Sequence, residues 1–320
     1  MILKPILNTA DFSHVTQANI GVFAGQAWLS IYGEKLTLIG IYKDEQQLIG
    51  GFYFLKTKKF GLNFIKLPPY SPHCALAFSH ENKNVASSLN FTKELMQAVC
   101  DYLESEKFSI CVLAFPSSIR DMQPFFWKGY KVVPNYTYRI QLNQSVEQIV
   151  GNFDSKNRNA INKAIKENIQ VIESNETNAA LYRYFSQALH KAGANVYEQE
   201  LKGIFTQFAN ADNSFVMQAT LNDNVVGSVF CVYDEKACYY ILAGIDKESK
   251  IQGINNLLVL KCIEKAKNLG CSIFDFEGSM LKGVERFFRS FGPELIPYYT
   301  INKANVFLEM ALKFKKRSTF

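Results

Sequence analysis

Closely spaced cysteine pairs and clusters of metal-ligating residues are missing from this sequence of 320 residues. Its seven cysteines are odd in number and include no Cys-x-x-Cys pair, and its four histidines are scattered along the chain. No zinc-binding spacing can be written from them, so we predict no metal site. Unpaired cysteines are typical of a reducing compartment, and we expect them to be buried free thiols.

Long apolar runs are missing as well. Each apolar stretch is interrupted within about ten residues, whereas a membrane-spanning helix needs roughly 20. The first residues, MILKPILNTADFSHV, lack the basic start and long apolar run of a signal peptide. We therefore expect no transmembrane segment and a cytoplasmic protein, with the inner face of the membrane as a second location.

Neither sign of charge is in large excess, because the formal net charge is only +6. This charge permits an anionic partner but does not indicate a dedicated nucleic-acid-binding protein. Aromatic residues, by contrast, are abundant at 14% of the chain. They can supply large cores and aromatic-lined clefts.

The spacing of apolar residues predicts an α/β chain. Alternation predicts strands at 36–42, 48–55, 60–67, 110–115, 137–142, 215–221, 225–233, 237–245, 271–277 and 295–302. Helical periodicity predicts helices at about 90–107, 145–167, 177–191, 197–209, 253–269, 283–290 and 303–316.

The order of these elements repeats in the two halves of the chain. Motifs in the first half that recur in order in the second are Leu48-Ile49-Gly50 with Val225-Val226-Gly227, Phe115-Pro116-Ser117-Ser118 with Phe276-Glu277-Gly278-Ser279, Phe125-Phe126 with Phe287-Phe288, and Pro134-Asn135-Tyr136-Thr137 with Pro297-Tyr298-Tyr299-Thr300. Such ordered matches indicate a duplication. We predict two domains, 1–143 and 144–320.

A glycine opens a predicted helix in the second half, in Lys250-Ile251-Gln252-Gly253-Ile254-Asn255-Asn256. A helix N-terminus offers unpaired N–H groups, and glycine lets a phosphate approach the backbone. One interpretation is a donor-phosphate site formed by Lys250, Gly253, Asn255 and Asn256. The other is an ordinary helix start.

Two carboxylates end the predicted strand 271–277. Residues two apart share a face of a strand, so Asp275 and Glu277 are expected to project together. A desolvated Glu277 has a raised pKa and could serve as a general base, supported by Asp275. The alternative is that one of them pairs with Arg286 or Arg289 to brace the next helix.

Basic residues gather in two further places. Lys156 and Arg158, near the start of the second domain, form either a solvated helix face or an anion site for a substrate. The last predicted helix, about 303–320, is apolar and then basic. It could pack back on the first domain or contact an anionic membrane surface.

The chain, most clearly in its second half, resembles the Fem-type peptidoglycan bridge aminoacyltransferases and their relatives in the GNAT (acyl-CoA N-acyltransferase) superfamily. The segments that carry the resemblance are GINNLLVLKCIEKAKNLGCSIFDFEGS and VERFFRSFGPE, with weaker support from Phe23–Leu29, Pro68–Pro72, Phe125–Tyr138 and Lys156–Ala164. The pyrophosphate loop of the superfamily is matched only loosely at 250–255, and Phe288 stands where the family has a lysine associated with the aminoacyl donor.

The resemblance implies two tandem GNAT-like domains, mixed sheets flanked by helices. It implies an acyltransferase that moves an acyl or aminoacyl group onto an amine, on a cell-wall or envelope precursor. Acyl-CoA or aminoacyl-tRNA would be the donor substrate, with no permanently bound cofactor, and a small or lipid-linked precursor the acceptor. Arg286 and Arg289 are expected to line the substrate cleft. The alternatives are acyl-CoA-dependent acylation of a sugar or lipid precursor, and a non-catalytic binding module.

Overall fold

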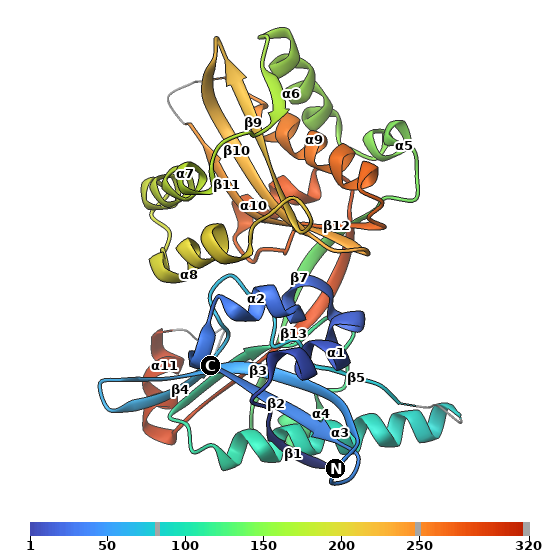
Figure 1. The fold of residues 1–320 in the computed structure, drawn as a ribbon, viewed down its shortest axis with the longest axis vertical. Coiled ribbons are helices and arrows are strands. Elements are labelled where there is room, and N and C mark those ends of the chain that lie inside the picture. The colour runs from blue at the N-terminus through green and yellow to red at the C-terminus, as the bar shows by residue number, and fades with distance from the viewer. Residues whose placement is uncertain (81–83, 247–250, 316–320) are drawn as a thin grey trace. The chain divides into compact units, whose positions relative to one another are not determined.

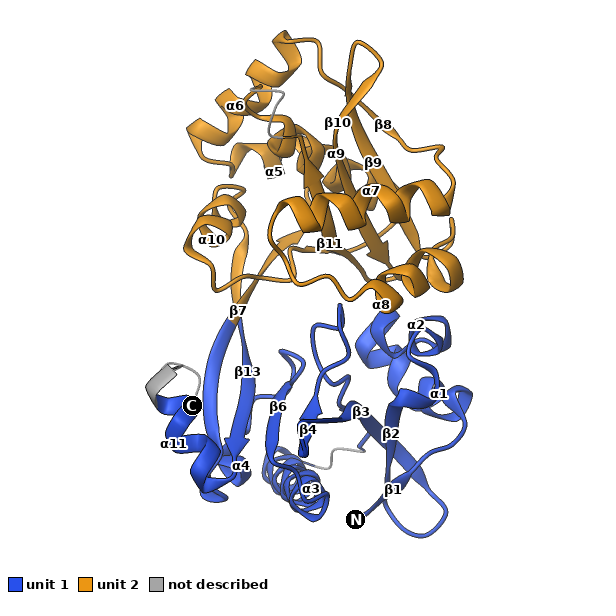
Figure 2. Cartoon of the chain, turned by 90° about the vertical axis from the view of Figure 1, so that its left-hand side faces the viewer, with its two compact units in different colours: residues 1–135, 297–320 blue, residues 136–296 orange. Residues whose placement is uncertain are grey.

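The computed structural model describes residues 1–80, 84–246 and 251–315, which form two compact units (Figures 1 and 2). Unit 1 comprises Met1–Asn135 and Pro297–Phe320, and unit 2 comprises Tyr136–Ile296. Within the described part of the chain, no helix has the length and apolar character needed to cross a bilayer.

Unit 1 is a mixed sheet with helices packed on it. Its strands are β1 (Ile2–Pro5), β2 (Leu36–Tyr42), β3 (Leu48–Lys59), β4 (Leu62–Lys66), β5 (Ala77–Phe78), β6 (Ile110–Ala114) and the last part of β13 (Glu294–Ala304). The sheet order is β1-β2-β3-β4-β6-β13, and β5 pairs with β3. Its helices are α1 (Thr9–Ile20), α2 (Gln26–Ser30), α3 (Val85–Ser105), α4 (Gln123–Trp127) and α11 (Val306–Lys315).

Unit 2 repeats this plan. Its strands are the last part of β7 (Lys131–Gln141), β8 (Gln170–Glu173), β9 (Ser214–Leu221), β10 (Asn224–Tyr233), β11 (Ala237–Ile245) and β12 (Ile273–Asp275), in the order β7-β12-β11-β10-β9-β8. Its helices are α5 (Val146–Gly151), α6 (Ser155–Lys166), α7 (Asn178–Lys191), α8 (Glu198–Gly203), α9 (Ile254–Asn268) and α10 (Lys282–Arg289).

The duplication predicted from the motifs is visible in the connections. In unit 1 a hairpin, β2-β3, is followed by β4, helix α3 and then β6, which pairs parallel with β4. In unit 2 the hairpin β9-β10 is followed by β11, helix α9 and then β12, which pairs parallel with β11. A short helix, α4 or α10, and a long strand, β7 or β13, close each copy.

The units divide the chain differently from the predicted domains 1–143 and 144–320. The closing strand of each copy pairs with the other copy: β7 places Arg139–Gln141 beside β12, and β13 places Thr300–Ala304 beside β6. The chain therefore leaves unit 1 inside β7 and returns to it inside β13. The predicted boundary at residue 143 follows the predicted strand 137–142, and the pairing of this strand with the other copy is not visible in the sequence.

Each unit has its own apolar core. The core of unit 1 lies between α3 and the strands β2, β3 and β6, and that of unit 2 lies around α9, β10, β11 and β12. All seven cysteines are buried and free, as expected, and burial raises their pKa values. No group of three or more metal-ligating side chains was found among the described residues.

Candidate active site

Asp275 ends strand β12 as a buried carboxylate with only 2% of its surface exposed. The antiparallel register of β12 on β7 sets it opposite Arg139. Its Oδ2 accepts a hydrogen bond from Arg139 Nε at 2.6 Å, and its Oδ1 accepts one from the Thr137 hydroxyl at 2.5 Å. Because Arg139 supplies an opposite charge and both carboxylate oxygens accept hydrogen bonds, these partners offset the cost of burying Asp275.

Glu277 is brought to Asp275 by a turn, and the predicted strand alternation is wrong here. Strand β12 already ends at Asp275, and Glu277 has a left-handed φ of 58°. Its backbone N–H donates to Asp275 Oδ1 at 2.9 Å. A glutamate in this conformation is strained, which is common where a fold orients a functional side chain.

The position of this turn is fixed by the glycine that follows. A Cβ on Gly278 would lie 2.1 Å from the Tyr136 carbonyl oxygen, and Gly278 has a φ of 68°. Only glycine allows β7 to pass so closely. The Asp-Phe-Glu-Gly sequence therefore sets the Asp275 carboxylate against β7 and brings the Glu277 backbone to that carboxylate.

The surroundings of Glu277 raise the affinity of its carboxylate for a proton. Burial, together with the nearby Asp275 charge, raises the pKa of Glu277 well above its ordinary value, and Arg139 opposes this shift. Burial and the same two carboxylates also raise the pKa of Tyr239, which pairs with Asp275 in the β11-β12 register. A carboxylate whose pKa is raised is a stronger base than an ordinary glutamate, which suits it to proton transfer.

The predicted brace between this pair and the next helix is not the one observed. Asp275 pairs with Arg139, whereas Arg289 pairs with Glu285 at 2.7 Å. Glu285 also accepts a hydrogen bond from the Tyr138 hydroxyl at 3.0 Å. Arg139 was missed from the sequence, although a lone arginine inside the alternating strand 137–142 was a usable signal.

Strand β11 continues past the position of Asp275 and Glu277. Its pairing with β12 covers only Ala237–Tyr239, and β11 runs on to Ile245. The register with β10 shifts between Leu242 and Tyr240, so Ile241 is an extra residue, a β-bulge. Bulges turn backbone groups out of their ladder and are frequent beside active sites.

The helix start at Gly253 is packed against its own chain. Gly253 has a φ of 91°, and a Cβ there would lie 2.0 Å from the Ala160 carbonyl oxygen of α6. The glycine is thus required for the packing of α6 on α9, whatever else binds there. No side chain caps α9 at this residue, and Lys250 lies outside the described residues.

The two predicted asparagines of this segment already have partners. Asn255 Oδ1 accepts a hydrogen bond from the Tyr240 hydroxyl at 3.3 Å, and Asn256 Nδ2 donates to Asn157 Oδ1 at 3.1 Å. Asn157 in turn donates to the Ser290 hydroxyl at 2.9 Å. These bonds tie the first turns of α9 and α6 to the end of α10.

A groove of about 910 Å³ lies over this junction and brings four predicted residues together. Lys156, Asn256, Arg286 and Arg289 line it, together with Asp154, Ser155, Asn157, Ala160, Gly283, Phe287 and Ser290. Lys156, Arg286 and Arg289 are exposed, so their charges face the groove and solvent. Lys156 and Arg286 give the groove a cationic character, whereas Arg289 is paired with Glu285. Asp154 caps α6 by accepting from the Asn157 N–H at 2.6 Å.

Arg158 does not line this groove. Its guanidinium donates to the backbone carbonyls of Phe153 and Gly151, at the turn between α5 and α6. Phe288, at the position of the family's lysine, is 5% exposed and packs on Phe276 with ring centroids 4.8 Å apart. This position belongs to the core and cannot supply a cation.

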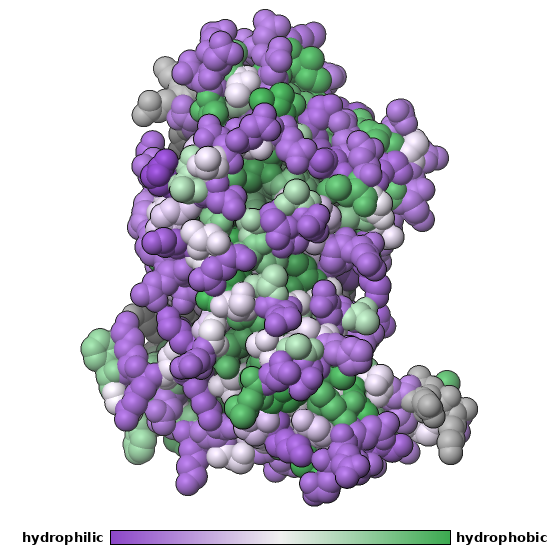
Figure 3. All heavy atoms as spheres, in the orientation of Figure 1, coloured by the Kyte–Doolittle hydropathy of each residue, from purple (hydrophilic) through white to green (hydrophobic). Residues whose placement is uncertain are grey.

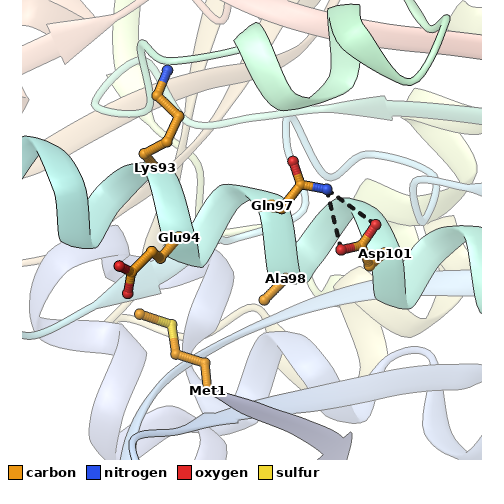
Figure 4. Close-up of a pocket in the computed structure, with 6 residues that line it drawn as sticks. All are labelled: Met1, Lys93, Glu94, Gln97, Ala98 and Asp101. Carbon is orange, nitrogen blue, oxygen red and sulfur yellow. Dashed lines mark hydrogen bonds between the residues drawn. The ribbon is translucent and has the colours of Figure 1, made fainter.

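A second hollow, of about 420 Å³, lies along α3 in unit 1 (Figure 4). Met1, Lys93, Glu94, Gln97, Ala98 and Asp101 line it. Gln97 donates to both carboxylate oxygens of Asp101, and Lys93 pairs with Asp121 at 2.5 Å. Because Lys93, Gln97 and Asp101 are already paired in this hollow, we place the candidate active site in unit 2.

Comparison with known proteins identifies the fold of this site. Residues 153–289 match the family described as "Acetyltransferase (GNAT) domain". No curated protein sequence matches the chain.

Solved structures match over almost the whole chain at low identity. FemX aligns with a TM-score of 0.63 and 11% identity, over 93% of this chain and 97% of FemX. The C-terminal domain of a protein described as a lysylphosphatidylglycerol synthetase of Agrobacterium fabrum aligns with a TM-score of 0.60 and 9% identity, over 95% and 96% of the two chains. A tandem GNAT protein from the clavulanic acid biosynthesis pathway aligns with a TM-score of 0.56 and 7% identity, over 94% and 98%.

The predicted fold and the resemblance to the GNAT superfamily are thereby confirmed. An acyl donor used by such a domain is a substrate and not a resident cofactor. Residues 153–289 are therefore similar to GNAT acetyltransferase domains, and the whole chain has the fold of FemX and of the tandem GNAT protein.

Proposed function

We propose that unit 2 moves an acyl or aminoacyl group from a thioester or ester donor to an amine on a cell-envelope precursor. The observation that carries this proposal is Glu277, a carboxyl group of raised pKa, held beside Asp275 where β12 ends and β11 continues.

Glu277 is the general base of the proposed reaction. It accepts a proton from the amine as nitrogen attacks the donor carbonyl and the C–N bond forms. The C–S or C–O bond of the donor then breaks, and the leaving thiolate or alkoxide takes up the proton that Glu277 received, which restores the carboxylate. Asp275 and Arg139 are positioning residues, because they hold the turn and set the pKa of Glu277.

The carbonyl oxygen gains negative charge in this step and needs hydrogen-bond donors. The backbone of β11 at the Ile241 bulge, beyond the last residue paired with β12, is our candidate for the N–H group. The groove at Lys156, Asn256, Arg286 and Arg289 is our candidate for the donor's phosphate groups, since arginine and lysine pair well with phosphate.

The nature of the acceptor is supported by the neighbours alone. One of them is described as a synthetase of lysylphosphatidylglycerol, and FemX shares the same tandem fold. These names favour a lipid-linked precursor as acceptor, with an aminoacyl-tRNA as one candidate donor. The match to an acetyltransferase domain favours an acyl-CoA donor, with a sugar or lipid precursor as acceptor.

The proposal is tested by binding and turnover on the same variants. Acetyl-CoA, longer acyl-CoAs and charged tRNA would be titrated in thermal-shift experiments, where a donor at 100 times its Kd stabilises by about 2.7 kcal/mol. Arg286→Glu should weaken donor binding at least tenfold. Arg183→Glu, an equal charge change at an exposed position of α7, should leave it unchanged.

Transfer to amine acceptors would be followed by release of CoA or deacylated tRNA. Binding without transfer would favour the non-catalytic module over an enzyme. Donor binding that is equally strong in both variants would remove the groove from the proposal. No binding and no transfer with any of these donors would contradict the proposed function.

A further inference from the structure

Helix α11 exposes an apolar face in unit 1. Phe307 is 84% exposed, Val306 is 72% exposed, and Met310 lies one turn further along the same side. Leu308 and Leu312, on the opposite side, are half-buried. The helix therefore packs on unit 1 with one apolar side and exposes a second apolar side to solvent. An exposed apolar surface of this kind often marks an interaction site.

Lysines accompany this exposed face. Lys313 lies one turn after Met310 and pairs with Glu309 at 2.8 Å, and the sequence continues with Lys315-Lys316-Arg317. A helix with an apolar side and basic residues near its end is typical of segments that lie in a membrane interface.

The turn between β3 and β4 repeats this combination. Phe60, at its tip, is 91% exposed with a left-handed φ of 51°. Lys58 and Lys59 precede it and are exposed, and the Lys59 ammonium lies 5.3 Å from the Phe60 ring centroid. This turn therefore presents an aromatic ring to solvent with two lysines directly before it.

The two segments lie on one side of unit 1. Both are at the left-hand margin of that unit in Figure 1, the side that faces the viewer in Figure 2. Apolar side chains reach the surface at this margin in the space-filling view (Figure 3). We call Lys58, Lys59, Phe60, Val306, Phe307, Met310 and Lys313 the basic-apolar surface.

We propose that the basic-apolar surface binds a lipid bilayer that contains anionic lipids. Its aromatic and aliphatic tips can enter the headgroup region while its lysines meet anionic headgroups. A second copy of the chain fits less well, since a stable interface takes roughly 20–30 residues a side and these two segments expose far fewer. This inference does not depend on the chemistry proposed for unit 2.

Sedimentation of the full chain with vesicles tests the proposal. Vesicles of phosphatidylcholine with about 30% phosphatidylglycerol should bind the protein, pure phosphatidylcholine should bind it much less, and added salt should weaken binding. Lys58→Gln with Lys59→Gln should lower partitioning at least tenfold, because each lysine near an anionic surface contributes roughly fivefold. Phe60→Ser with Phe307→Ser should lower it at least as much.

Leu7→Ser is the matched control, since Leu7 is 98% exposed but lies outside the basic-apolar surface. It should bind like the wild type, and circular dichroism should show all variants folded. No sedimentation of the wild type, equal binding to neutral vesicles, or equal binding of all variants would overturn the proposal. A concentration-dependent dimer that Phe307→Ser abolishes would also overturn it, because a second copy would then cover the helix.

Discussion

Replacing Glu277 by glutamine separates a catalytic from a structural role for this residue. The change keeps the volume and the backbone bond to Asp275 but removes the proton acceptor. Loss of general-base help typically lowers turnover by about 10²–10⁴. Donor binding should persist, because Glu277 does not line the groove assigned to the donor.

The same variant should not lose stability. The pKa of Glu277 is raised in the folded state by burial and by Asp275. When the pKa of a carboxyl group is higher in the folded than in the unfolded protein, the protonated group stabilises the folded state. This stabilisation is complete below the pKa of the unfolded state and is lost as the pH rises through the pKa of the folded state. A tenfold difference in proton affinity between the folded and unfolded states corresponds to about 1.4 kcal/mol. The wild type should therefore lose stability over this pH window, and Glu277→Gln should not.

Melting temperatures from about pH 4 to 9, with turnover measured on the same samples, check this reasoning. We expect Glu277→Gln to melt at or above the wild-type temperature at neutral pH while turnover falls. A lower melting temperature, with turnover lost only in step with the folded fraction, would refute the catalytic assignment. Glu277 would then be a structural part of the turn.

The other predictions concern the groups around this site. Arg139→Met should destabilise by about 3–5 kcal/mol in denaturant unfolding, because Asp275 is left buried without its cation; a loss below about 1 kcal/mol would contradict this. Asp275→Asn should lower the pKa of Glu277 and move the acid limb of the pH–rate profile to lower pH, and an unmoved limb would exclude Glu277 as its source. Gly253→Ala should cost at least about 2 kcal/mol more than Gly270→Ala, since both have positive φ but only Gly253 meets a carbonyl. A fragment of residues 144–320 should fail to fold cooperatively because it lacks β7, and a cooperative melt would contradict the strand exchange.

The third of these predictions corrects an expectation from the sequence. The sequence left two interpretations of Gly253, a donor-phosphate site and an ordinary helix start, and under the first Gly253→Asp would block the phosphate with little effect on folding. The contact with Ala160 shows that the same change breaks the packing of α6 on α9, so substitutions at this glycine cannot report on donor binding. Arg286 is the better position for that test.

The strands were predictable from sequence because alternation of apolar residues is a local property, and β2, β9, β10 and β11 lie close to their predicted ranges. Helix 145–167 was wrong as one element, because Asp154 caps a new helix, α6, after α5 has ended. Strand β12 stops early because Glu277 is left-handed. Neither the Asp154 cap nor the left-handed turn at Glu277 alters the periodicity of apolar residues from which these elements were predicted.

The candidate site was only half predictable for a related reason. Asp275 and Glu277 are two residues apart, so their proximity follows from the sequence. Arg139 and Thr137 reach Asp275 across strands of the two copies, 136 and 138 residues away along the chain. The exchange of closing strands decides this contact, and no local pattern reports it.

The two copies also differ at the points where the proposed chemistry requires particular residues. Pro116 stands in the first copy where Glu277 stands in the second, and a proline side chain can neither accept nor donate a proton. Helix α3 is capped by Asn84, whose side chain accepts from the Ser87 N–H, whereas α9 begins at Gly253 without a side-chain cap. A duplicated fold therefore retains one set of groups suited to the reaction, and the first copy contributes β7, which carries Arg139 and Thr137, to the carboxylate pair of the second.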